Sequence, residues 1–192
     1  GLEHLRVGID SEAEYLYKQL PELYVDLSAI AKGFGVDMVS EYLAEEGITD
    51  HLVEIGGEVR LSGLNRHRQP WTIAVEKPGP GTGSVQQVIA VGNNSVATSG
   101  DYRNYYELDG QRLSHTIDPA TGHPITHQLA SVTVIHPSCM IADGLATALT
   151  VMGPERALAF AEQHRLAVYL LTKTDDGFRV DMTSAFKKYS RG

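Results

Sequence analysis

The chain has 192 residues, of which 16 are basic and 24 acidic, and its formal net charge at pH 7 is −8. Binding to nucleic acid or to an anionic membrane surface depends on Lys and Arg, so this balance argues against both. A phosphorylated small molecule is not excluded, because a metal ion can supply the local positive charge. With a single cysteine, Cys139, no intramolecular disulfide is possible, and its apolar setting favours a buried residue over a nucleophile. No apolar run approaches the length of a membrane span.

The beginning of the chain predicts short elements. Residues 4–10 can form a strand, and residues 11–23 predict a short helix or a turn that Pro21 breaks. Residues 25–27 are then expected to be the end of a brief strand.

A long helix is expected next. Ser28 is a plausible N-cap, the helix runs through about Glu46, and Gly47 is a natural stop. Because Gly33 and Gly35 fall inside this helix, they do not form a dinucleotide-binding fingerprint. Its apolar positions keep the helical spacing: Ile30, Phe34, Met38, Val39, Tyr42 and Leu43.

Strands dominate the middle of the chain. Gly56 and Gly57 favour a tight turn between two strands, and the alternative is that their amides lie against a ligand. Asp109 and Gly110 are typical of a hairpin turn within residues 105–113. The other expected strands are residues 51–55, 58–63, 71–78, 85–91 and 95–100.

The last third mixes strands with helices. Residues 131–137 predict a buried strand, Met140 to Met152 a helix, and Pro154 opens a second helix as its first residue. A closing hairpin is expected from residues 167–173 and 178–183. Runs of strands with helices gathered between them indicate an α+β fold, a largely antiparallel sheet with packed helices. No linker is evident, so we expect a single domain over residues 1–192.

Two segments carry the clearest chemical signal. Asp143 and Thr147 are four residues apart in the expected helix that begins near Met140, which puts both oxygens on one face. Carboxylate and hydroxyl oxygens suit Mg²⁺, which proteins usually share with phosphate. Asp26 and Lys32 flank the start of the earlier helix. Taken alone, such residues are more often a cap or a solvated face, but together they describe a place for a metal-bound diphosphate.

Two other segments offer polar groups. Residues 97–106 contain hydroxyls, an Arg and tyrosines that could meet a phosphate or simply pack across strands. Residues 114–124 contain His115, which can take a proton near neutral pH, and Asp118 before a proline. A hydrogen-bonded structural histidine and an ordinary Asp-Pro turn are the alternatives. Zinc, P-loop and serine-hydrolase motifs are absent from the sequence.

In order, VDLSAIAKGFGVD, VEIGGEV, TSGDYRNYY, LSHTIDPATGHPI and ADGLATAL resemble the motifs of the ApbE family, the FAD:protein FMN transferases. The resemblance covers the chain from about Tyr24 to its end. It implies an ApbE-like, T-fold-like architecture and binding of FAD and Mg²⁺. It also implies cleavage of the FAD diphosphate, transfer of FMN to a threonine of a partner flavoprotein in a redox complex, and release of AMP.

The resemblance also implies roles for individual residues. Asp26 and Lys32 resemble the acid and the base that contact FAD, and Ile117 lies in the segment that runs along the flavin. His115 matches a histidine proposed to assist proton transfer. The expected metal ligands are the backbone carbonyl of Ala29 and the side chains of Asp143 and Thr147.

Two expectations concern the protein beyond this chain. Family members usually have a sizeable N-terminal part that helps to hold FAD, and we expect this chain to begin after it. A periplasmic location with a lipid anchor is implied in the same way. Four alternatives to protein flavinylation stay open: an FAD-binding protein without catalysis, an FAD diphosphatase that releases FMN and AMP, a folded but inert fragment, and a Mg²⁺-dependent hydrolase of another nucleotide diphosphate.

Overall fold

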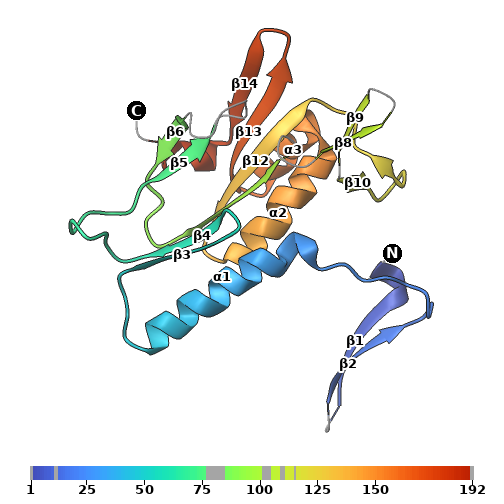
Figure 1. Ribbon diagram of the computed structural model, residues 1–192, viewed down its shortest axis with the longest axis horizontal. Helices are drawn as coiled ribbons and strands as arrows, with labels where there is room; N and C mark the ends of the chain where they lie inside the picture. The colour runs from blue at the N-terminus through green and yellow to red at the C-terminus, as the bar shows by residue number, and fades with distance from the viewer. Residues whose placement is uncertain are drawn as a thin grey trace.

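The computed structural model describes residues 2–10, 13–76, 85–100, 105–108, 111–114 and 116–190. At its centre lies a six-stranded antiparallel sheet with the strand order β14-β13-β12-β7-β4-β3 (Figure 1). The α+β prediction is therefore confirmed. The strands of this sheet are β3 (His51–Ile55), β4 (Glu58–Ser62), β7 (Ser95–Gly100), β12 (Leu129–His136), β13 (Ala167–Thr174) and β14 (Gly177–Met182).

In the described residues, four helices and four small hairpins accompany this sheet. The helices are α1 (Ser28–Glu45), α2 (Cys139–Met152), α3 (Pro154–Gln163) and α4 (Ser184–Lys187), with a 3-10 turn at Leu2–His4. None of the helices in the described ranges is long and apolar enough to cross a membrane. The hairpins pair β1 (Leu5–Ile9) with β2 (Glu14–Lys18), β5 (Ile73–Glu76) with β6 (Val85–Ile89), β8 (Tyr105–Leu108) with β9 (Gln111–Ser114), and β10 (Ile117–Asp118) with β11 (His123–Pro124).

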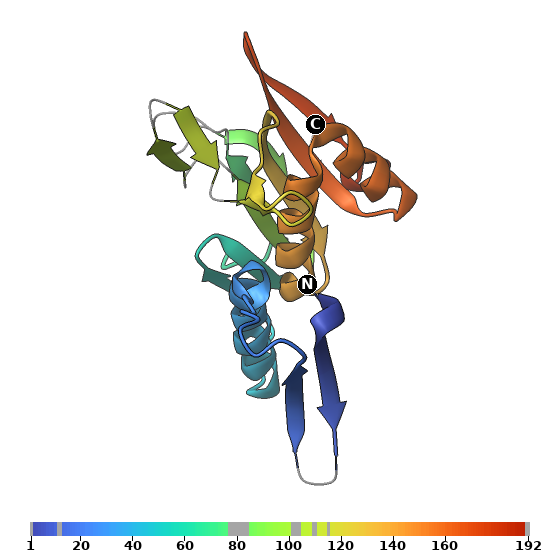
Figure 2. The same ribbon diagram turned by 90° about the vertical axis from the view of Figure 1, so that its right-hand side faces the viewer.

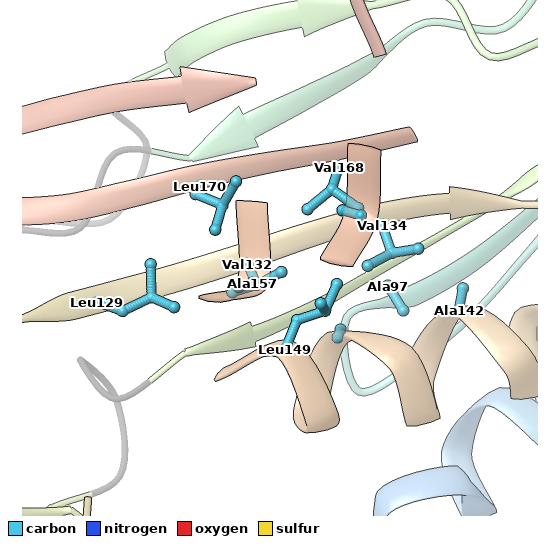
Figure 3. Close-up of a cluster of buried hydrophobic side chains, with 11 residues drawn as sticks. Ala97, Leu129, Val132, Val134, Ala142, Leu149, Ala157, Val168 and Leu170 are labelled. Atoms are coloured by element: carbon cyan, nitrogen blue, oxygen red, sulfur yellow. The ribbon is translucent and has the colours of Figure 1, made fainter. Parts of the chain in front are cut away.

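Both faces of the sheet are covered, so its central strands are buried on both sides. Along β13, Val168 and Leu170 face helices α2 and α3, in a cluster that also contains Val132 and Leu149 (Figure 3). Tyr169, between them, points to the opposite face, where β5, β6 and α4 supply Val75, Ile89 and Phe186. This explains why β12 and β13 are buried along nearly their whole length rather than at alternate positions.

The beginning of the chain differs from the prediction. Residues 14–18 form the second strand of a hairpin, in which Leu5 pairs with Lys18 and Ile9 with Glu14, rather than a helix or turn. The β-favouring tyrosines and the preceding strand together outweigh the helical reading. Residues 25–27, expected as a strand end, are irregular. Figure 2 shows the hairpin extending away from the rest of the chain.

Helix α1 forms at its predicted place, with two corrections. The N-cap is Leu27 rather than Ser28, and the side chain of Leu27 forms no capping hydrogen bond. Gly47, just beyond the helix, takes the left-handed conformation with φ +80°, as its role as a stop requires. Of the six apolar positions with helical spacing, Phe34, Met38, Val39 and Tyr42 are exposed, whereas the buried positions are Gly33, Val36, Asp37 and Ser40.

Candidate functional site

A cavity of about 1090 Å³ lies where the start of α1, the β3–β4 turn and α2 meet. Strands β5 and β7 and the residues around β10 complete its wall. Six of the seven residues that the sequence singled out line it, although they come from three distant parts of the chain. They are Asp26, Ala29, Lys32, Ile117, Asp143 and Thr147. His115, the seventh, lies outside the described residues.

A close contact between α1 and α2 brings the two main segments together. A Cβ atom added to Gly33 would lie only 2.4 Å from the carbonyl oxygen of Cys139, so no other residue fits at this crossing without movement. The amide of Gly33 donates a hydrogen bond of 3.0 Å to Oδ2 of Asp143. The first turn and a half of α1 therefore lies directly beside the acidic residue of α2.

Asp143 is buried, with 5% of its surface exposed, and Thr147 follows it one helical turn later. Burial raises the pKa of the Asp143 carboxyl, although the Gly33 amide and the nearby Lys32 oppose this. In a regular helix the amide of Gly33 donates to the carbonyl of Ala29. Here that amide donates to Asp143, and Ala29 lines the same cavity as Asp143 and Thr147.

The oxygen atoms of Asp143, Thr147 and the nearby backbone are suitable ligands for a hard divalent cation. Within the described residues no cluster of three or more His, Cys, Asp or Glu side chains is arranged to hold a metal. A cation in this cavity would therefore rely on the Asp143 carboxylate together with the Thr147 hydroxyl, a main-chain carbonyl, phosphate oxygens and water. Such all-oxygen sets are typical of Mg²⁺ bound with a phosphate substrate.

Asp26 lies exposed at the mouth of the cavity, just before α1. Its Oδ1 accepts a hydrogen bond of 2.8 Å from the amide of Ser28. This backbone bond holds the pKa of the Asp26 carboxyl below its usual value. The Asp26 side chain thus satisfies one of the first amides of the helix. This is the role of a capping residue, although Asp26 lies one residue before the N-cap Leu27.

Lys32 reaches across the cavity wall to strand β4. Its Nζ lies 2.7 Å from Oε2 of Glu58, a residue that is only 2% exposed. No other described group donates a hydrogen bond to that oxygen. Burial raises the pKa of the Glu58 carboxyl, the ion pair with Lys32 lowers it, and Asp143 raises it further. The left-handed turn at Gly56 leaves room for the Lys32 stem, whose Cδ would be 3.1 Å from an added Cβ.

A third buried carboxylate, Asp37, fixes the start of α2 against α1. It accepts hydrogen bonds from the amides of Cys139 and Met140 and from the hydroxyl of Ser138, and Arg60 donates to it at 2.8 Å. Burial alone would raise its pKa, but these donors together hold the pKa of Asp37 below its usual value. The register of the two helices, and hence the position of Asp143, depends on this contact.

The third predicted segment lies on the far wall of the cavity. Ile117 is half-exposed and lines the cavity. Asp118 accepts a hydrogen bond of 2.8 Å from the amide of Ala120 through Oδ1 and so opens a turn. The turn reading of this Asp-Pro pair is confirmed.

A model of the ApbE family matches residues 1–170. The chain belongs to the ApbE family. It is 56% identical to the FAD:protein FMN transferase of Vibrio cholerae and 46% identical to that of Escherichia coli K12, in each case over 98% of its length. It spans about half of these curated relatives, 55% and 54% of their respective lengths.

Solved ApbE structures share the fold. The flavin transferase ApbE from Vibrio cholerae superposes with a TM-score of 0.86 at 54% identity, over 98% of this chain and 59% of that one. The apo form of the flavinyl transferase ApbE from Pseudomonas stutzeri gives 0.85 at 43% identity, over 98% and 57%. The expected ApbE-like architecture is therefore confirmed.

Sequence reasoning missed two residues of this candidate site, Glu58 and Asp37. Glu58 directly follows the Gly56-Gly57 pair, for which the sequence favoured a turn over contact with a ligand. That turn is confirmed, and its two glycines also line the cavity. Asp37 lies within a helix, where an acidic residue is expected on the solvent face. The signal that could have found it is its place among the apolar positions, next to Val36.

Proposed function

We propose that this chain provides the catalytic site of a Mg²⁺-dependent FAD:protein FMN transferase, whose acceptor is a threonine of a flavoprotein subunit in a redox complex. The names of the relatives support the reaction class. The observation that carries the proposal is the single cavity lined by Lys32, Asp143, Thr147 and the first turn of α1. Its size leaves room for a dinucleotide rather than only a small anion.

The reaction exchanges one phosphate bond for another. The hydroxyl oxygen of the acceptor threonine attacks the phosphorus of the FMN half of FAD, and the bond from that phosphorus to the bridging oxygen breaks. AMP leaves with the bridging oxygen, and the hydroxyl proton must pass to a base. We propose His115 for that base, from the resemblance alone.

The side chains around the cavity divide the remaining work. Asp143, Thr147 and the carbonyl of Ala29 would hold Mg²⁺, which when bound neutralises charge on the diphosphate oxygens. Lys32 adds a compact positive charge on the same wall. Asp26 and Ile117 are proposed to contact FAD at the mouth and on the far wall of the cavity. Amides at the start of α1 favour a negative group there.

The test is to incubate the 192-residue chain with FAD and Mg²⁺, with and without an acceptor flavoprotein, and to measure AMP. Transfer predicts AMP together with an acceptor whose mass has grown by one FMN. AMP with free FMN only would instead make the chain an FAD diphosphatase. FAD that binds and stays intact would reduce it to a binding protein, and cleavage of other nucleotide diphosphates at equal rates would indicate a general hydrolase.

The cellular location is proposed from the resemblance alone. The resemblance to the ApbE family implies a periplasmic protein held at a membrane by a lipid anchor. Fractionation of cells that express the full-length protein tests this, with recovery in the periplasmic membrane fraction as the expected result.

A further inference from the structure

The ion pair between Lys32 and Glu58 is the best-defined contact in the cavity wall that the proposed metal ligands do not explain. Glu58 is buried, and its Oε2 has the Lys32 ammonium as its partner within the described residues. Lys32 itself is half-exposed and lines the cavity. The pair thus joins a fixed, buried carboxylate to a cation that can still reach a ligand.

The side chain of Lys32 is held from three elements. Its backbone belongs to α1, its stem passes the glycine turn between β3 and β4, and its ammonium ends on Glu58 of β4. A free lysine side chain loses conformational entropy when a ligand fixes it. A lysine that the protein already holds in place loses less, so its contact with a ligand is stronger.

The charges around the cavity make the Lys32 ammonium important for binding an anionic ligand. Among the described lining residues Lys32 is basic, whereas Asp26, Glu54, Glu58 and Asp143 are acidic. A diphosphate entering such a cavity meets mostly repulsion, apart from what a divalent cation and Lys32 offset. The strength of the attraction between Lys32 and the diphosphate therefore depends on where the Lys32 ammonium lies.

We propose that Glu58 is a positioning residue, which holds the Lys32 ammonium at the place where it meets the diphosphate of FAD. This inference rests on the proposed function, because it names which group of that same site receives the diphosphate. Glu58 itself touches neither FAD nor the reacting atoms. Its effect passes through Lys32.

The proposal predicts an effect opposite in sign to simple electrostatics. Replacing Glu58 by Gln removes a negative charge near the diphosphate, which by charge alone would tighten FAD binding. If Glu58 positions Lys32, the same substitution weakens FAD binding by about tenfold, which is the lower end of the loss seen when the partner that orients a metal-binding side chain is removed. The direction of the change therefore separates the two accounts.

The experiment is a double-mutant cycle on the 192-residue chain with Glu58→Gln, Lys32→Met and the double variant. FAD affinity is measured from flavin fluorescence at saturating Mg²⁺, with AMP quantified in the same samples and thermal unfolding followed by circular dichroism. We expect each single variant to weaken FAD binding about tenfold and the double variant to be no weaker than Lys32→Met within about twofold. Glu41→Gln is the matched control, since it removes an exposed carboxylate paired with Arg60 away from the cavity.

The outcomes distinguish this inference from the function on which it rests. If Glu58→Gln binds FAD as tightly as the unmodified chain, or if its effect persists undiminished in the Lys32→Met background, Glu58 does not act through Lys32. A fall in the unfolding temperature with unchanged FAD affinity would make the pair a purely structural contact and overturn the inference as well. An unmodified chain that neither binds nor cleaves FAD would overturn the proposed function, and this inference with it.

Discussion

The amide of Gly33 donates a hydrogen bond of 3.0 Å to Oδ2 of Asp143, although 110 residues separate the two in the chain. This bond joins the first part of α1 to α2 at the cavity. It also explains why a helix contains a glycine at this point, since a Cβ would meet the carbonyl of Cys139. Two sequence segments that are unremarkable alone become one site through this contact.

Asp143→Asn is predicted to abolish Mg²⁺-dependent FAD cleavage while leaving the fold intact. The amide oxygen of Asn can still accept the hydrogen bond from Gly33, but the anionic metal ligand is lost. We expect the rate of AMP release to fall by about a hundredfold or more. Near-normal turnover in a folded variant would show that Asp143 is not a metal ligand.

Gly33→Ala is predicted to destabilise the chain, because the new Cβ would lie 2.4 Å from the carbonyl oxygen of Cys139 and push α1 away from α2. Overpacking of this kind costs about 1–3 kcal/mol of unfolding free energy. Gly35→Ala is the matched control, since its Cβ would meet only the end of the Ile55 side chain at 3.3 Å. There the better helix propensity of Ala offers a gain of about 0.5–1 kcal/mol. Equal stability of the two variants in urea unfolding would refute the role of Gly33 at the crossing.

Asp37→Asn is predicted to lower stability in a manner that depends on pH. The folded state holds the pKa of this carboxyl below its ordinary value of 3.8, so its contribution is present above that pH and is lost as pH falls through the folded pKa. We expect the variant to unfold about 1–3 kcal/mol more easily at neutral pH. The gap from the unmodified chain should shrink below pH 3.8, and urea unfolding at a series of pH values measures it. If the difference in unfolding free energy between the two proteins stays constant at pH values below 3.8, the carboxylate charge is not what stabilises the contact.

Cys139 is predicted to resist alkylation in the folded chain. Its side chain is fully buried, and burial raises the pKa of its thiol to about 12, so hardly any reactive thiolate is present at neutral pH. Mass spectrometry after treatment with iodoacetamide should find the thiol unmodified under native conditions and fully modified in denaturant. Rapid labelling of Cys139 under native conditions would contradict this prediction and show that the start of α2 is open to solvent.

Much of the fold could be predicted from the sequence because local patterns determine it. The glycine turn between β3 and β4 and the two helices after β12 follow from turn residues and periodicity. Residues 14–18 were misread because their conformation depends on pairing with β1, a partner that local propensity does not see. The apolar stripe of α1 shows the same limit, since Asp37 is buried while Phe34 and Tyr42 are exposed.

The candidate site was predictable in its parts but not in its connections. Asp143 and Thr147 could be found because their spacing places two oxygens on one helix face. Glu58 could not, because its role depends on the path of Lys32 past the Gly56 turn. The burial of Asp37 likewise could not be predicted, because it depends on the first amides of α2. Their position is known only once the two helices are packed together.

The central claim is that α1 and α2 together hold a divalent ion beside the diphosphate of FAD. Binding of Mn²⁺, a spectroscopic substitute for Mg²⁺ at oxygen sites, tests it most directly, by electron paramagnetic resonance in the presence of FAD. We predict one bound Mn²⁺ per FAD-loaded chain, lost in Asp143→Asn and kept in the control Glu41→Gln. Equal Mn²⁺ binding by the unmodified chain and Asp143→Asn would contradict the claim.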